Sequence, residues 1–380
     1  MNTSDVTGKS RSATASGAAS NELRGTSRRR FLASAAAGAA VISAAPLAFT
    51  ASRTSEEIIT GEGQHKFRVV HAWPQLPDRY TWQTTHNVAV DKGGNLYVIH
   101  EGRKEQKDHP SIFVFDSSGK FVRAFGSQFQ GGGHGIEVRE EGGEEFLYVA
   151  AYQQIKAFAK LTLTGETVWY KRAPMESGVY ASAEDRSTEA VWGNDRFLPT
   201  NFAFLDDGGF LLADGYGSFY IHRYDRDANW VSCFGGAGDG EGKFKTAHGL
   251  WVDKREGREP TIVVTDRAHD TLQIFTMDGK YIETLTGYGL PANIDSWKNL
   301  LVVPELKARV TLLDENNQVV AQLGSAIDRL GEVKDLRVKP DEWKNGQFVH
   351  PHDACFTPEG DIFVAEWVGT GRVTKLERVS

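Results

Sequence analysis

The sequence contains little of what marks several common protein classes. Only two cysteines, Cys233 and Cys355, occur among 380 residues, and the repeats described below place them in different copies. A small disulfide framework is therefore excluded, and we expect no disulfide bond. The formal net charge of −7 provides no basic excess, which argues against a nucleic-acid-binding surface. No stretch shows helical periodicity of useful length, so a helical protein is not expected.

The first 51 residues have the composition of a targeting segment. A Ser-rich polar lead is followed by the stretch SRRRFLA at 27–33 and by an alanine-rich apolar run, an order that closely matches a twin-arginine export signal. An amphipathic transit peptide or a low-complexity tail is the alternative. The run is broken by Gly38 and Pro46 and is weakly hydrophobic for a membrane span. We expect a linker at 52–64.

Export by this route predicts a periplasmic or extracellular location. The export machinery would then be a partner of the chain through its signal segment. Attachment to a membrane is expected only if the segment is retained as an anchor. The remaining residues, 65–380, are expected to form the folded domain.

Short strand patterns recur throughout this remaining part of the chain. Apolar alternation, a Gly-rich turn and a second apolar strand are followed each time by another hairpin, as in THNVAVDKGGNLYVIH and SIFVFDSSGKFVRAFG. Successive copies start 48, 67, 47, 45 and 59 residues apart, close to the 40–50 residues of a four-stranded propeller blade. The residues that open the six copies are His86, His134, Asn201, His248, Asn293 and His352.

The pattern predicts an all-β, six-bladed β-propeller. The stretch 65–73 has no copy of its own, so we expect it to supply the outer strand of the last blade and close the ring, which removes an exposed sheet edge. The two longer spacings indicate insertions at 171–198 and 325–348. We expect the tryptophans, Trp192 among them, to pack within blades.

Three histidines open alternate blades of the predicted ring. Because the first strand of each blade lines the central channel, His134, His248 and His352 would point at the axis about 120° apart. Three imidazoles with one open face are typical of a catalytic zinc site. The alternative is a polar channel lining without metal, and His86, which opens blade 1, need not bind anything.

Asp353 is a second candidate ligand. A single carboxylate that faces a channel lined by backbone carbonyls suits a hard cation such as Ca²⁺, and the carbonyls of Val88 and Ile136 would be its natural partners. Orientation of a metal-binding histidine by Asp353 is an equally good interpretation on chemistry alone.

The copies resemble the NHL repeat over 65–380, most completely in His86–Val98. Among NHL propellers the chain is similar to peptidyl-α-hydroxyglycine α-amidating lyase, also called peptidylamidoglycolate lyase. The resemblance implies that His134, His248 and His352 hold zinc. It also implies that Tyr216, in the stretch ADGY, is catalytic, with Arg267 beside it.

The same resemblance implies a structural calcium ion held by Asp353 and the carbonyls of Val88 and Ile136. It further implies a lyase that cleaves the carbon–nitrogen bond of an α-hydroxy amide, which is either a small molecule or a peptide. In this mechanism Tyr216 takes a proton from the substrate hydroxyl, which requires nearby cations to lower its pKa.

Two residues depart from the pattern of that family. Glu101 stands where the family has a catalytic arginine, so Arg103 or Arg267 would have to steady a substrate carboxylate. His350 replaces a methionine before Pro351 and adds another candidate ligand or proton carrier near the metal. The metal ligands are therefore retained better than the residues that recognise the substrate.

Two other functions stay open. One is a non-catalytic propeller that binds a peptide, glycan or protein at the same channel mouth. The other is a lactonase-like calcium hydrolase, which Asn201 and Asn293 fit only loosely because no ring of acidic channel residues is evident in the sequence.

Overall fold

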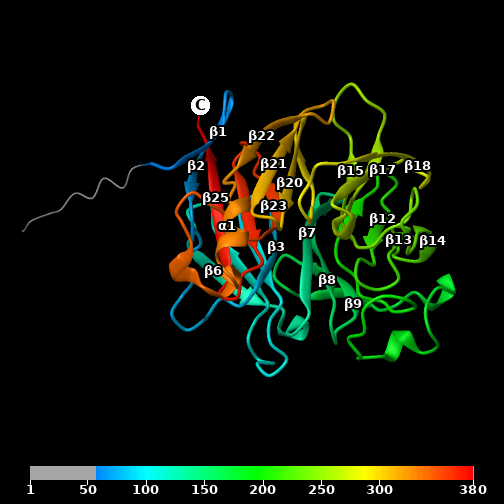
Figure 1. Cartoon of the computed structure of the whole chain (residues 1–380). Coiled ribbons are helices and arrows are strands. Elements are labelled where there is room, and N and C mark those ends of the chain that lie inside the picture. Colours follow the sequence, from blue (N-terminus) through cyan, green and yellow to red (C-terminus); the bar gives the residue numbers. More distant parts are fainter. Residues whose placement is uncertain (1–56, 380) are drawn as a thin grey trace, which may run out of the picture. The chain divides into compact units, whose positions relative to one another are not determined.

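A computed structural model describes residues 57–379. The twin-arginine segment predicted at 1–51 lies outside these residues. Within 57–379, no helix is long and apolar enough to cross a membrane. Six antiparallel sheets account for the architecture, and this confirms the predicted six-bladed β-propeller (Figure 1).

Each of the first three blades contains four strands in chain order. Blade 1 consists of β3 (Thr85–Val90), β4 (Leu96–His100), β5 (Ile112–Phe115) and β6 (Phe121–Phe125). Blade 2 consists of β7 (Gly133–Glu141), β8 (Glu144–Ala151), β9 (Ala157–Thr162) and β10 (Thr167–Lys171). Blade 3 consists of β11 (Phe202–Phe204), β12 (Phe210–Ala213), β13 (Tyr220–Tyr224) and β14 (Trp230–Gly235).

The second half of the ring repeats this arrangement. Blade 4 consists of β15 (Ala247–Asp253), β16 (Thr261–Asp266), β17 (Thr271–Phe275) and β18 (Tyr281–Leu285). Blade 5 consists of β19 (Asp295–Trp297), β20 (Leu300–Glu305), β21 (Arg309–Leu313) and β22 (Val319–Leu323). Blade 6 combines β23 (Pro351–Phe356), β24 (Ile362–Glu366) and β25 (Arg372–Arg378) with β2 (His65–Val70) and β1 (Ile59–Glu62).

The ring closes in blade 6, where the two ends of the described chain meet. Strand β2 pairs with β25, with Phe67 opposite Arg378, and Figure 1 shows these blue and red strands side by side. The closing strand was predicted from the sequence. Strand β1 was not, because it lies in the stretch 52–64 that was taken as a linker. Its pairing with β2 adds a fifth strand to this blade.

Helices are few and short, and they fall mainly in the predicted insertions. The helix α1 (Ile327–Glu332) and the 3₁₀ turns η5 (Leu336–Val338) and η6 (Pro340–Glu342) lie between β22 and β23. The turns η2 (Met175–Ser177) and η3 (Glu184–Arg186) lie between β10 and β11. Two more turns, η1 (Ser127–Phe129) and η4 (Arg267–His269), follow β6 and β16.

Apolar faces of neighbouring blades pack together to form the core. Tyr97 and Ile99 of blade 1 are fully buried against Leu147 and Val149 of blade 2, and similar clusters join the other blades. The first strands form the inner ring, since β3 contacts both β7 and β23, and β11 contacts both β7 and β15. Residues on these first strands are therefore the ones that reach the channel.

Candidate metal site at the channel mouth

Four buried histidines meet where the first strands of blades 1, 2, 4 and 6 begin. Each lies at a break in strand pairing. In blade 1, for example, Thr85 pairs with His100 and Asn87 pairs with Ile99, so His86 is left between two paired residues. The same irregularity surrounds His134, His248 and His352. A β-bulge re-aims the extra side chain, which explains why all four imidazoles reach the axis.

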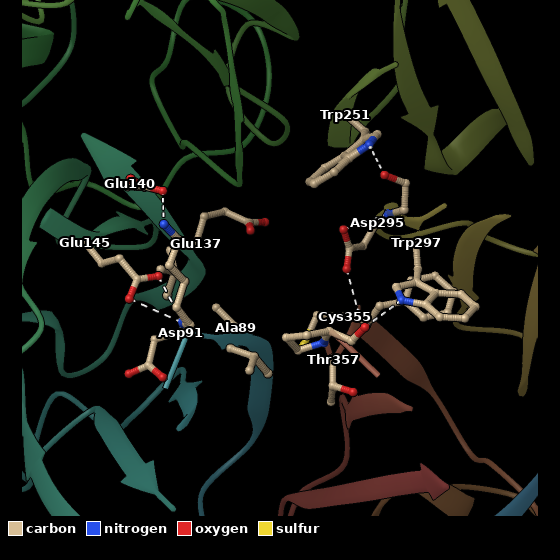
Figure 2. A pocket seen from close by; sticks show the side chains of 16 residues that line it. Ala89, Asp91, Glu137, Glu140, Glu145, Trp251, Asp295, Trp297, Cys355 and Thr357 are labelled. Carbon is tan, nitrogen blue, oxygen red and sulfur yellow. Dashed lines mark hydrogen bonds and ion pairs between the residues drawn. The ribbon is translucent and has the colours of Figure 1, made fainter. Parts of the chain in front are cut away.

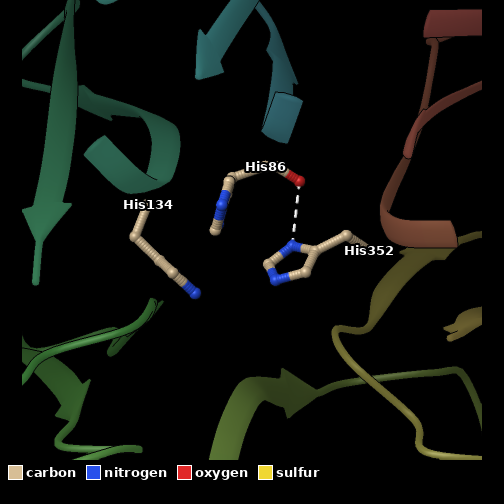
Figure 3. A group of neighbouring side chains, drawn as sticks. All are labelled: His86, His134 and His352. Carbon is tan, nitrogen blue, oxygen red and sulfur yellow. Dashed lines mark hydrogen bonds between the residues drawn. The ribbon is translucent and has the colours of Figure 1, made fainter. Parts of the chain in front are cut away.

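The four rings form a rhombus around the axis. The centroid of His134 lies 5.0 Å from that of His352, and both rings lie 4.5–4.8 Å from the rings of His86 and His248. The ring therefore contains two triangles that share one edge. One triangle is the predicted set of His134, His248 and His352. The other contains His86 in place of His248 (Figure 3).

Backbone carbonyls fix the orientation of three of these rings. Nδ1 of His134 lies 2.9 Å from the oxygen of Thr200, and Nδ1 of His248 lies 2.6 Å from that of Ala292. Nδ1 of His352 lies 3.0 Å from the oxygen of His86. Because a carbonyl oxygen only accepts, each Nδ1 carries the hydrogen and each Nε2 presents a lone pair. Burial lowers the pKa of all three imidazoles well below the ordinary value, so they are neutral.

Glycines beside two of the histidines permit this close approach. A Cβ at Gly135 would collide with the carbonyl oxygen of Thr200, and a Cβ at Gly249 would lie 2.6 Å from that of Ala292. These are the carbonyls that hold His134 and His248. Gly135 and Gly249 therefore allow the carbonyl groups to come close enough to orient the two imidazole rings.

Two nitrogen lone pairs face each other across the axis. Nε2 of His134 lies 3.1 Å from Nε2 of His248. Two nitrogens bound to one tetrahedral zinc at about 2.0–2.1 Å would be separated by roughly 3.3–3.4 Å. Nε2 of His352 is buried without a hydrogen-bond partner within 57–379. The residues therefore fit a metal with nitrogen ligands.

Tyr216 and Arg267 lie against this cluster, as predicted. The Tyr216 hydroxyl lies 2.8 Å from Nε2 of His248 and 3.3 Å from Nε2 of His134. Nη1 of Arg267 donates to the same hydroxyl oxygen at 2.8 Å. Burial raises the pKa of Tyr216, although the charge of Arg267 opposes this. In the protein alone, desolvation outweighs the guanidinium. The expectation that nearby cations, zinc among them, lower this pKa stays a prediction.

An insertion covers Tyr216 from outside. Trp192 packs on its ring with centroids 4.2 Å apart and remains half exposed at the mouth. The insertion is held by buried Glu184, which pairs with Lys156 and accepts a hydrogen bond from the Phe197 amide at 2.9 Å. The expectation that Trp192 packs within a blade is wrong, because the insertion carries this side chain to the channel mouth.

Glu101 lies beside His86 at the same mouth. Its Oε2 is 3.5 Å from Nε2 of His86. Burial would raise the pKa of Glu101, but the neighbouring His86 ring, the Tyr152 hydroxyl and the charge of Arg337 hold it below the ordinary value. Glu101 is therefore ionised. Arg337 lies in the insertion before β23. It was not singled out in the sequence because the repeat pattern does not predict how an insertion folds.

Two other candidates lie away from the histidine ring. The side chain of His350 is occupied elsewhere, since its Nδ1 lies 2.6 Å from the oxygen of Leu306 and its ring packs edge-on against Trp367. Arg103 is exposed in the loop after β4. The structure therefore brings His86 and Glu101 to the ring but does not bring His350 or Arg103 there.

Asp353 follows His352 in strand β23 and is fully buried. Its Oδ2 accepts the N–H of Val88 at 2.8 Å, and its Oδ1 accepts Nδ2 of Asn293 at 2.6 Å. Val88 therefore contacts Asp353 through its amide. Calcium ligation by the Val88 carbonyl stays a prediction. Ile136, the other expected carbonyl donor, is buried in strand β7, where it pairs with Val149.

Two further carboxylates accompany Asp353, contrary to the sequence interpretation. Burial and the charge of Asp353 raise the pKa of Glu137 well above its ordinary value. Burial also raises the pKa of Asp295 to about 6 and that of Asp353 to about 7. Asn201 donates to Glu137 at 3.1 Å. The acidic group was missed because Glu137 and Asp295 occupy different offsets from the residues that open their blades.

A pocket of about 370 Å³ opens onto this acidic group from the other end of the inner strands. Figure 2 shows Glu137, Asp295 and Cys355 around it, with Trp251 and Trp297 at its wall. The channel thus presents nitrogen donors at one end and oxygen donors at the other. These two sets suit different classes of metal ion.

Comparisons with known proteins agree with the architecture. No protein-family model matches the chain, and no curated protein matches it. Among solved structures it is similar to a gluconolactonase from Xanthomonas campestris, with 12% identity and a TM-score of 0.55, over 84% of this chain and 94% of that one. The NHL-repeat and amidating-lyase resemblances stay predictions.

Two lyase structures are similar to a comparable extent. A streptogramin B lyase has 11% identity and a TM-score of 0.50, over 82% of this chain and 97% of that one. Virginiamycin B lyase from Staphylococcus aureus has 11% identity and a TM-score of 0.50, over 82% of this chain and all of that one. At such identities the likeness shows the fold alone. The chain is a six-bladed β-propeller whose structural neighbours include a gluconolactonase and two lyases.

Proposed function

We propose that the chain is a metal-dependent carbon–nitrogen lyase that cleaves an α-hydroxy amide, as the resemblance to the amidating lyase implies. One observation carries the proposal. The Nε2 lone pairs of His134 and His248 face each other at 3.1 Å, beside a tyrosine hydroxyl that is held by Arg267. A cation between two facing lone pairs would relieve their repulsion. Neutral imidazoles suit zinc.

His134, His248 and His352 would hold the zinc ion in this proposal. A bound zinc ion supplies Lewis-acid polarisation of an oxygen-containing group of the substrate. Their Nδ1 hydrogen bonds to backbone carbonyls keep the three Nε2 atoms directed at one point. Such hydrogen bonds at the second nitrogen are the usual support of metal-binding histidines.

Tyr216 is placed to hold or transfer a proton at its hydroxyl oxygen. In the reaction the substrate hydroxyl loses its proton, its carbon becomes a carbonyl, and the bond to nitrogen breaks while nitrogen gains a proton. The products are an amide and an aldehyde acid. Arg267 donates to the Tyr216 oxygen at 2.8 Å, so it would stabilise negative charge there. Trp192 would shield this oxygen from water.

Arg337 is the best placed group to bind a substrate carboxylate in place of the missing arginine. Its Nε donates to the Trp367 oxygen at 3.0 Å and its guanidinium stacks on the Trp367 ring, which fixes the side chain. Its charge reaches Glu101 and Tyr152 at the mouth. The exposed Arg103 lacks such support.

The direct test combines metal analysis with an activity assay on the purified chain. We expect about one zinc per chain and release of an aldehyde acid from a peptide that ends in α-hydroxyglycine. Removal of the metal by a chelator should stop the release, and zinc should restore it. A folded protein that takes up no zinc and cleaves no α-hydroxy amide would refute the lyase and favour a binding propeller.

We also propose that a calcium ion binds at the acidic group of Asp353, Glu137 and Asp295. Neighbouring carboxylates add to the raised pKa of Glu137 and of Asp353, so the group calls for a proton or a cation, and oxygen donors favour Ca²⁺. Addition of Ca²⁺ should therefore raise the melting temperature. At 100 times the dissociation constant the gain is about 2.7 kcal/mol.

Calorimetry with and without Ca²⁺ checks this expectation, with Glu137→Gln as the variant that should lose most of the shift. Glu140→Gln is the matched control, because Glu140 lies at the exposed rim and pairs with Lys92. An equal calcium shift in wild type and Glu137→Gln would remove Glu137 from the site.

The acidic group also supports a second candidate, a calcium-dependent lactone hydrolase. In the sequence, no ring of acidic channel residues was evident, which argued against a lactone hydrolase. Glu137 and Asp295 now supply acidic residues beside Asp353. The two candidates differ in their metal. Lactone hydrolysis that needs only Ca²⁺ and survives the loss of His134 would favour the hydrolase over the lyase.

A further inference from the structure

We propose that His86 is a fourth ligand of the metal at the channel mouth and that Glu101 is the positioning residue that orients it. The proposal rests on the metal-binding part of the proposed function and extends it from three nitrogen ligands to four. Nothing in the lyase resemblance assigns a role to His86.

The first support is the unsatisfied state of the ring. His86 is 1% exposed, and within residues 57–379 neither of its nitrogens has a hydrogen-bond partner at ordinary distance. Buried imidazole nitrogens without partners are costly. His86, His134 and His352 each offer a nitrogen within 4.8 Å of the others. A metal ion at the ring would satisfy His86 together with Nε2 of His352.

The second support is the carboxylate behind the ring. Nε2 of His86 lies 3.5 Å from Oε2 of Glu101. A carboxylate oxygen at this place would accept the imidazole N–H, so Nε2 would carry the hydrogen and Nδ1 the lone pair. Glu101 then does for His86 what backbone carbonyls do for the other three histidines. Each of the four would have an acceptor for its second nitrogen, as metal-binding histidines usually do.

The four-nitrogen arrangement selects the kind of metal. Four neutral imidazoles suit zinc, copper, iron or nickel and do not suit calcium or magnesium. This also accounts for a glutamate at position 101, where the resembled family has an arginine. A carboxylate supports a fourth histidine, whereas a guanidinium would repel the cation.

The test measures metal binding directly and needs no activity. Metal-free protein is titrated with Co²⁺, whose visible spectrum reports its ligands, and affinity is measured by competition with a chelator. His86→Asn is the chosen variant because Asn201 and Asn293 occupy the same place in blades 3 and 5. We expect it to lower affinity at least 100-fold and change the spectrum.

Glu101→Gln should lower affinity about 10- to 100-fold, as loss of a supporting group does, and keep the wild-type Co²⁺ spectrum. His350→Ala is the matched control and should leave both readouts unchanged, because that ring is held by Leu306. Circular dichroism confirms that each variant is folded.

X-ray absorption of the zinc-loaded wild type supplies a measurement that needs no variant. Four imidazoles around zinc are expected, and three would overturn the proposal. It would also be overturned if His86→Asn kept wild-type affinity and spectrum while His134→Ala lost them, which would leave the three-histidine site intact. Retention of metal by both variants would overturn the metal site itself, and the proposed lyase with it.

Discussion

His134→Ala is expected to remove the bound zinc and to lower turnover of an α-hydroxy amide by about 10³-fold or more. His134 belongs to both triangles of the histidine ring, because it forms the edge that they share with His352. Its loss therefore removes one ligand from either possible set of three. A catalytic metal contributes several kcal/mol to transition-state stabilisation, and each 1.36 kcal/mol corresponds to a factor of ten in rate. Elemental analysis and the aldehyde assay measure the two losses.

The matched control is His71→Ala. His71 lies just after β2 in blade 6, where it bonds Thr374 at 2.8 Å and the Gly346 amide at 3.0 Å, away from the channel ring. This variant should keep its zinc and its turnover. Loss of zinc with full retention of activity in His134→Ala would contradict the metal-dependent mechanism.

The sequence predicted the convergence of three histidines because the strand pattern recurs in every blade. His134, His248 and His352 are 114 and 104 residues apart, and only a six-fold arrangement of first strands brings such positions together. The same period places His86 at the start of blade 1, but the sequence left open whether it binds anything. All four side chains reach the axis through a bulge, such as the one between Thr85 and Asn87, which has no sequence signature of its own.

The remainder of the site comes from segments that do not follow the repeat. Trp192 and Arg337 belong to insertions, whose paths depend on contacts such as the Glu184–Lys156 pair and the stacking of Arg337 on Trp367. The acidic group was hidden for a related reason, since Asp295 opens β19 whereas Glu137 lies within β7. A repeat predicts positions that recur, and these residues occur once.

Tyr216→Phe is expected to lower kcat about 10²- to 10⁴-fold, the range typical of a lost proton-transfer group, with little change in KM. Phenylalanine retains the ring that packs against Trp192 and Tyr152, so the wall of the site should persist. The zinc content should stay near one per chain, because all four histidines remain. Steady-state kinetics and elemental analysis on the same sample provide both quantities.

Tyr180→Phe is the matched control for this prediction. Tyr180 is also buried, but its hydroxyl bonds Asp214 at 3.0 Å and His222 at 2.6 Å and does not contact the histidine ring. Its loss should cost about 1 kcal/mol of folding stability and leave kcat unchanged. If Tyr216→Phe turned over as fast as Tyr180→Phe, Tyr216 would be a wall of the channel, and Arg267 would have no charged oxygen to stabilise.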